Sequence, residues 1–175
     1  MSTQAHLVDN NMEKVARHLL DEAMLRETSD EKDVFGRSVF NRYYYATFLN
    51  VKEGLSGLKK EWEGNLAHAS IPEMLRGQIQ SELKRGLAKA KRASDSEVAS
   101  LCSRAITATK SLATLMEVGR TLRVTADYHP EVAIDFSIGP YFHLNEFSVE
   151  DAKSWAPRAR IFVNTISHAW KQVYA

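Results

Sequence analysis

The sequence predicts an all-α fold, an antiparallel bundle of about five helices with an irregular, aromatic-rich connection before the last helix. Apolar residues recur every three or four positions along most of the 175 residues, which places them on one face of each helix. Helix-start sequences precede four of these stripes, at Thr28, Ser70, Ser94 and Ser148. No segment shows a convincing alternation of apolar and polar residues, so no sheet is needed to bury the core.

The first two helices are predicted from apolar stripes and a capping sequence. The first is expected at residues 8–27, and Thr28-x-x-Glu31 predicts a capping box that starts the second. The second helix carries two stripes, and two buried faces indicate a central position in the bundle. The first stripe is Val8, Met12, Val15, Leu19 and Ala23; those of the second helix are Phe40, Tyr44, Phe48, Val51 and Leu55 on one side and Val39, Tyr43 and Ala46 on the other.

The third and fourth helices follow from two further start sequences. Ser70-Ile-Pro-Glu73 combines a cap hydroxyl, a proline in the first turn and an acidic third residue, and this helix should run to about residue 90. Ser94-x-x-Glu97 repeats the capping pattern, and the apolar stripe that follows ends near Leu122.

The helical periodicity stops between Thr125 and Phe147, where aromatic residues are expected to hold an irregular connection against the bundle. A short strand over Val132–Ile138 is compatible with this segment but not required. Ser148-x-x-Asp151 predicts the start of the last helix. Pro157 should either kink that helix or mark its true first turn.

Composition limits the classes of function. Lys and Arg number 23 against 22 Asp and Glu, so the overall charge does not favour a nucleic-acid coat protein or a membrane-surface binder. Any anion site must therefore be local. The length fits a single domain over residues 1–175. The one cysteine, Cys102, excludes an intrachain disulfide framework and falls in an apolar stripe, where burial would make its thiol unreactive.

Other features argue against membranes and cofactors. The N-terminus is polar and no apolar run approaches the roughly 20 residues that span a bilayer, so we expect no signal peptide and no membrane partner. The single cysteine fits a reducing cytosol, so we expect a cytoplasmic location. The histidines lack metal-ligand spacings such as His-x-x-x-His, and glycine-rich phosphate loops are absent. We therefore expect no metal and no cofactor.

The segment Arg123-Val-Thr-Ala-Asp-Tyr-His129 places a permanent cation and an imidazole near each other in sequence. Cleaving RNA through its own 2′-hydroxyl requires a proton acceptor, a proton donor and cationic stabilisation of the phosphorane. An imidazole, which titrates near neutrality, suits proton transfer, and a guanidinium can hold two phosphate oxygens. A simpler interpretation stays open, in which Arg123 and Asp127 form an ordinary salt bridge at a helix end.

Three motifs occur in a recognisable order: Arg37-Ser38-Val-Phe-Asn-Arg42-Tyr43-Tyr44-Tyr45-Ala46-Thr-Phe48, then Leu66-Ala-His68 with Ile71-Pro72, then Arg123-x-x-Ala126-Asp127-Tyr128. Together they resemble motifs of the HEPN-domain family, and the resemblance covers roughly residues 8–172. It implies an antiparallel helical bundle that usually dimerises. In members with an Arg-x(4–6)-His motif it also implies metal-independent RNA cleavage at the dimer cleft.

The resemblance, together with the chemistry, gives a set of candidate site residues. Arg123 and His129 are the expected catalytic residues, and two-fold symmetry would bring a second pair into the same cleft. The tyrosines of the second helix are also expected in the core, and its arginines can equally lie over a neighbouring helix. The expected substrate-binding residues are Asp127, Tyr128, Arg37, Arg42 and Tyr45.

Two functions from different classes follow. The first is a HEPN-type endoribonuclease that acts on RNA as a homodimer, as a toxin or an antiviral-defence effector. The second is a non-catalytic HEPN module that binds a nucleotidyltransferase-like antitoxin or another defence partner. Val124 favours the second, because active relatives usually carry a polar residue directly after the arginine, whereas the spacing of Arg123 and His129 favours the first.

Overall fold

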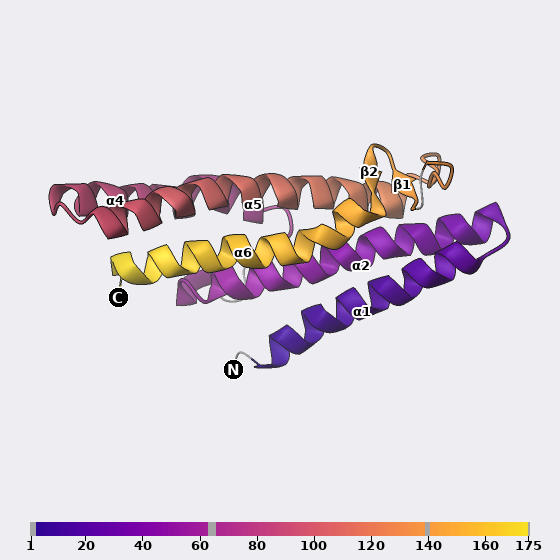
Figure 1. The fold of residues 1–175 in the computed structure, drawn as a ribbon, viewed down its shortest axis with the longest axis horizontal. Coiled ribbons are helices and arrows are strands. Elements are labelled where there is room, and N and C mark those ends of the chain that lie inside the picture. The colour runs from indigo at the N-terminus through magenta and orange to yellow at the C-terminus, as the bar shows by residue number, and fades with distance from the viewer. Residues whose placement is uncertain (1–2, 63–65, 139–140, 175) are drawn as a thin grey trace. The chain divides into compact units, whose positions relative to one another are not determined.

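The protein is an all-α helical bundle, as the sequence predicts (Figure 1). The computed structural model describes residues 3–62, 66–138 and 141–174, with side chains from residue 11 onward, so Val8 of the expected first stripe lies outside the described side chains. The described elements are α1 (Thr3–Leu25), α2 (Ser29–Ser56), the 3₁₀ helix η1 (Lys60–Trp62), α3 (Ile71–Met74), the π-helical η2 (Leu75–Ile79), α4 (Gln80–Arg92), α5 (Ser96–Tyr128), β1 (His143–Leu144), β2 (Phe147–Ser148) and α6 (Val149–Tyr174).

Two of the predicted capping boxes are confirmed. At the start of α2, the Glu31 amide donates to Thr28 Oγ1 at 3.3 Å, and the Thr28 hydroxyl donates to Glu31 Oε2 at 3.0 Å. At the start of α6, the Asp151 amide donates to Ser148 Oγ at 3.1 Å and the Ser148 amide donates to Asp151 Oδ2 at 3.0 Å. α6 therefore begins at Val149 with Pro157 inside it, so the alternative that Pro157 marks its first turn is wrong.

The other two caps differ from the prediction. Ser70 precedes α3, but its hydroxyl donates to the Ala67 carbonyl at 2.9 Å instead of capping the helix. Ser94 ends the preceding helix with a φ of 56°, which moves the cap to the next residue. The carboxylate of Asp95 accepts from the Val98 amide at 3.0 Å and starts α5.

α5 is about six residues longer than predicted, since it ends at Tyr128 and not near Leu122. Ala126 is buried and continues the apolar stripe, although the polar residues around it hide the periodicity. The amide of His129 still donates to the Thr125 carbonyl at 3.0 Å. Pro130 then ends the helix, because proline disfavours helical geometry in the residue before it.

The chain divides into two compact units, Met1–Asn50 with Val118–Pro157, and Val51–Glu117 with Arg158–Ala175. α2, α5 and α6 each contribute residues to both units. In the first unit, α1 runs antiparallel to the beginning of α2 (Figure 1). The single domain expected from the length stays a prediction.

Aromatic side chains hold the connection after α5 against α2 in the first unit, as predicted. Phe142 is fully buried, with its ring edge-on to Phe40 at 6.0 Å between centroids and 4.8 Å from the ring of Phe136. Gly36 makes room for this packing, because an added Cβ would lie 3.1 Å from Ile134 and 3.4 Å from Phe142. The connection is thus fixed by the core of this unit.

The connection also contains a small antiparallel hairpin that the sequence did not predict. β1 and β2 pair His143 with Ser148 and Leu144 with Phe147. The residue at the turn, Asn145, has a φ of 54°, a conformation that asparagine tolerates better than most residues. Within the segment considered for a strand, 132–138, the described residues form only an isolated bridge between Asp135 and His143.

Close helix contacts and aromatic packing organise the second unit. A Cβ on Gly54 would collide with Val163, and one on Gly86 would lie 2.6 Å from Val173, so two glycines let α6 approach α2 and α4. Trp62 packs edge-on against Trp170 at 5.5 Å. Cys102 is fully buried, and burial raises the pKa of its thiol, in agreement with the expected unreactive cysteine.

Tyr43 carries a polar atom that the core of the first unit does not satisfy. Its side chain is only 2% exposed, and its hydroxyl has no hydrogen-bond partner among the described residues. Burial raises the pKa of Tyr43 to about 12. We expect Tyr43→Phe to increase the free energy of unfolding by about 1 kcal/mol at neutral pH, because it removes an unsatisfied buried group.

The same substitution should change the alkaline limb of stability. Because the pKa of Tyr43 is raised in the folded state, folding favours the neutral phenol. The resulting contribution to the free energy of unfolding is present below pH 10 and is lost as the pH rises to about 12. Phenylalanine has no proton to lose, so the advantage of Tyr43→Phe should grow over that range in urea titrations. Tyr128→Phe, at a residue 65% exposed, is the matched control. A loss of stability in Tyr43→Phe would contradict this account.

Candidate functional site

Three of the candidate residues, Arg123, Asp127 and Tyr128, lie in the last turns of α5 in the first unit, and His129 follows directly. Arg123 Nε lies 2.8 Å from Asp127 Oδ2, so the salt bridge considered from the sequence is present. The two side chains are 28% and 27% exposed. The other carboxylate oxygen of Asp127 accepts a hydrogen bond from the Asn41 side-chain amide on α2. Asp127 therefore links Arg123 to α2.

The Arg123 side chain also lies against an aromatic ring. Its guanidinium carbon is 5.6 Å from the ring centroid of Tyr128, a distance typical of cation–π contacts. Tyr128 is 65% exposed, so one face of this arrangement is open to solvent. Within the part of the chain that the structure describes, the two terminal nitrogens of Arg123 make no hydrogen bond. The outer edge of the guanidinium is therefore available to an anion.

His129 is held by a carboxylate in a similar way. Its Nδ1 lies 2.8 Å from Glu131 Oε1, and its side chain is 50% exposed. The pKa of Glu131 is lowered, first by a hydrogen bond from its own backbone amide and then by the bond to His129. If Nδ1 carries the proton that this carboxylate accepts, then Nε2 presents a lone pair. The contact thus favours a proton-accepting ring nitrogen.

A tight turn brings His129 and Glu131 together. The Val132 amide donates to the His129 carbonyl at 3.1 Å, which closes a four-residue turn. Pro130 occupies the second position of this turn, where its fixed φ is favoured. The turn agrees with the effect of Pro130, because a proline disfavours helical geometry in the residue before it.

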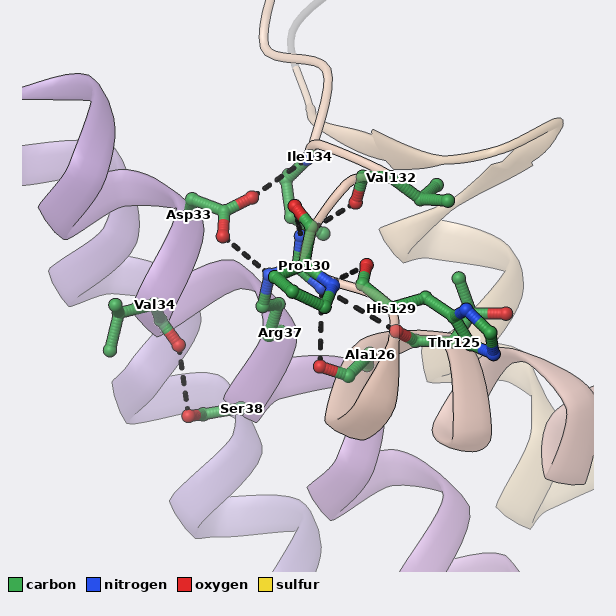
Figure 2. A network of polar contacts seen from close by, with 10 residues as sticks. All are labelled: Asp33, Val34, Arg37, Ser38, Thr125, Ala126, His129, Pro130, Val132 and Ile134. Carbon is green, nitrogen blue, oxygen red and sulfur yellow. Dashed lines mark hydrogen bonds and ion pairs between the residues drawn. The ribbon is translucent and has the colours of Figure 1, made fainter.

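Arg37 has a different place from the one expected of a substrate-binding residue (Figure 2). Its side chain is 13% exposed, its Nε pairs with Asp33, and its terminal nitrogens donate to carbonyl oxygens at distances from 2.6 to 3.5 Å. A guanidinium has five N–H donors, and the acceptors around it are at least as many. The acceptors are Asp33 and the carbonyls of Thr125, Ala126, His129, Pro130 and Val132. Contact of Arg37 with RNA would require some of these bonds to break, so this geometry makes it a structural residue.

The remaining two candidates lie elsewhere on α2. Arg42 is exposed on the helix surface. Tyr45 is half-buried, and its ring lies edge-on to that of Tyr44 at 6.4 Å between centroids. Tyr44 is fully buried, and burial raises its pKa to about 12 although Arg120 and Arg123 oppose that rise. A role for Arg42 or Tyr45 toward RNA stays a prediction.

The sequence interpretation missed three residues that organise the site, namely Asp33, Asn41 and Glu131. Asp33 carries a local signal, because it lies four residues before Arg37 on the same helix. Glu131 lies two residues from His129 across a proline turn, a spacing that also can be read from the sequence. Asn41 has no such signal, since its partner Asp127 is 86 residues away.

The charged groups named at this site give no surplus of positive charge, and the described residues include no metal-binding group. Arg37 and Arg123 are matched by Asp33 and Asp127, and Glu131 lies beside His129. In residues 3–62, 66–138 and 141–174, no group of three or more His, Cys, Asp or Glu side chains is arranged to bind a metal ion. Recognition of an anion here therefore depends on individual donors and not on a broad positive potential.

Comparison with protein-family models, with curated proteins and with solved structures finds no match. Among the described helices, none has both the length and the apolar character that crossing a bilayer requires.

Proposed function

We propose that the protein is a HEPN-type, metal-independent endoribonuclease that works as a homodimer, as a toxin or an antiviral-defence effector. One observation carries the proposal. Arg123 and His129 are each held along one edge by a carboxylate, at 2.8 Å in both cases, while the opposite edge makes no hydrogen bond within the described residues. A cation and a base that are oriented in this way, with their other nitrogens not hydrogen-bonded among the described residues, are suited to binding a phosphodiester and taking the proton of the 2′-hydroxyl beside it.

The proposed reaction uses groups that the chain supplies. Nε2 of His129 takes the proton of the ribose 2′-hydroxyl, and the 2′-oxygen attacks phosphorus. The bond from phosphorus to the 5′-oxygen breaks, and that oxygen receives a proton. The products are a 2′,3′-cyclic phosphate and a 5′-hydroxyl. Glu131 stabilises the imidazolium, and the terminal N–H groups of Arg123 donate to the non-bridging phosphate oxygens.

The homodimer follows from the count of proton-transfer groups. Each chain supplies one His129, whereas the reaction needs a base at the 2′-oxygen and an acid at the 5′-oxygen. His129 of the partner subunit would serve as the acid if a two-fold axis passes near the end of α5. Tyr128, exposed beside Arg123, offers a flat face on which a base can stack.

A second function is favoured by a specific observation. Asp127 neutralises Arg123, and Arg37 is committed to backbone carbonyls, so the site lacks the surplus of cations common to RNA-binding surfaces. A protein partner with paired charges would also suit this surface. The alternative is therefore a non-catalytic HEPN module that binds a nucleotidyltransferase-like or other defence partner.

The experiment that separates the two functions is RNA cleavage by purified protein in the presence of chelator. We expect the wild type to produce fragments with 2′,3′-cyclic phosphate ends and the double variant Arg123→Ala/His129→Ala to produce none. Cleavage that persists in the double variant comes from elsewhere and refutes the site. No cleavage by the wild type at high enzyme concentration, together with a stable complex with the product of a neighbouring gene, supports the non-catalytic module.

A further inference from the structure

Asp33 and Arg37 form a fixed pair on α2, around which the chain reverses direction after α5 (Figure 2). The carboxylate of Asp33 uses both oxygens, one on Arg37 Nε and one accepting from the Ile134 amide at 2.8 Å. The two residues of this pair are one helical turn apart on α2, but Arg37 contacts residues about 90 positions later in the chain. It thus connects the central helix to the segment that carries His129.

The Arg37 guanidinium acts as a C-terminal cap for α5. Helix carbonyls in the last turn lack amide partners, and the negative end of the helix dipole attracts a cation. One terminal nitrogen of Arg37 donates to the carbonyls of Ala126 at 3.2 Å and His129 at 3.1 Å, with Thr125 at 3.5 Å. The end of α5 is therefore set against α2 by this one side chain.

The other terminal nitrogen shapes the turn that follows. It donates to the carbonyl of Pro130 at 3.3 Å and to that of Val132 at 2.6 Å. Together with the bond to the His129 carbonyl, these contacts fix the first, second and fourth residues of the turn. Glu131 is the third residue, so its position opposite the His129 ring depends on the same contacts.

We propose that Arg37, held by Asp33, is a positioning residue. By donating to the carbonyls of the turn from His129 to Val132, it holds the His129 ring against Glu131. Its consequence for catalysis rests on the proposed nuclease function, whereas its effect on the His129 ring does not. The role requires arginine specifically, because lysine is a compact charge with three donors and cannot reach acceptors spread around a planar fork.

The test combines a spectroscopic signature with activity. NMR of the full-length protein labelled in its histidine rings reports the His129 environment, and Glu131→Gln supplies the signature of a lost carboxylate contact. We expect Arg37→Lys and Asp33→Asn to move the His129 ring signals toward that signature. Arg26→Lys is the matched control, since Arg26 also pairs with a carboxylate four residues earlier, Glu22, in the same unit.

Unchanged His129 ring signals in Arg37→Lys and Asp33→Asn, or an equal change in Arg26→Lys, would overturn the proposal. If Arg37→Lys does not fold, Asp33→Asn decides alone, because it keeps the size of the side chain. Where the wild type cleaves RNA, kcat should fall by at least about tenfold in Arg37→Lys with little change in KM, because Arg37 positions His129 without touching substrate. If the wild type is inactive, the nuclease proposal fails, and the ring signals still decide the positioning role.

Discussion

Replacing His129 with alanine is expected to reduce metal-independent RNA cleavage by roughly 10²- to 10⁴-fold, the usual contribution of a general acid–base group. The loss should be large because a symmetric site would lose its base and its acid in one substitution. It should appear in kcat, because the imidazole transfers protons and Arg123 holds the phosphate. Initial rates on a short RNA in chelator measure this effect.

Two variants separate catalysis from disturbance of the fold in that experiment. His18→Ala makes the same change at an exposed histidine on α1 and should leave the rate unchanged. Glu131→Gln keeps the shape of the side chain but removes the charge that would stabilise the imidazolium, so an intermediate loss is expected. The urea midpoint of His129→Ala should equal that of the wild type, since the ring is half-exposed. A rate above half that of the wild type would remove His129 from the mechanism.

Replacing Phe142 with alanine is expected to have the largest effect on stability, a loss of about 3–5 kcal/mol in the free energy of unfolding. Phe142 is fully buried between Phe40 of α2 and Phe136 of the connection. Its removal would leave a cavity where the connection meets the helix, and the neighbouring rings are too large to fill it without strain. Urea unfolding followed by circular dichroism measures the change.

The adjacent residue supplies the control for this second prediction. Tyr141 is also aromatic and lies in the same segment, but it is 38% exposed. Tyr141→Ala should therefore cost less than about 1 kcal/mol, as most substitutions outside the core do. Equal losses in the two variants would mean that the connection contributes through its backbone and not through the burial of Phe142.

Much of the fold could be predicted from local patterns. The capping boxes at Thr28 and Ser148 start helices where the sequence indicates, because their bonds join residues three positions apart. The failures at Ser70 and Ser94 have a shared cause. A serine hydroxyl caps the start of a helix when the serine itself has extended, non-helical backbone angles. Here the backbone of Ser70 is helical and that of Ser94 is left-handed, so neither hydroxyl caps the helix that follows.

The candidate site was less predictable than the helices. The Arg123–Asp127 pair follows from spacing along a helix, and it is present. Arg37, expected to bind substrate, instead donates to carbonyls of Thr125 to Val132. No local pattern indicates this, because those acceptors are backbone atoms that any sequence would provide. The sequence pattern also does not show the full length of α5, since Ala126 is an apolar residue among polar neighbours and only its burial marks it as helical core.

By itself, the sequence determined the all-α class, the starts of α2 and α6, and the pairing of Arg123 with Asp127, since each depends on residues within one or two helical turns. The tertiary structure decided where α5 ends, what Arg37 binds and how His129 comes to face Glu131. The physical reason is that these last features depend on carbonyls left unsatisfied at the end of one helix and on a guanidinium from another. Such a match is made by packing, between residues about 90 positions apart in the chain.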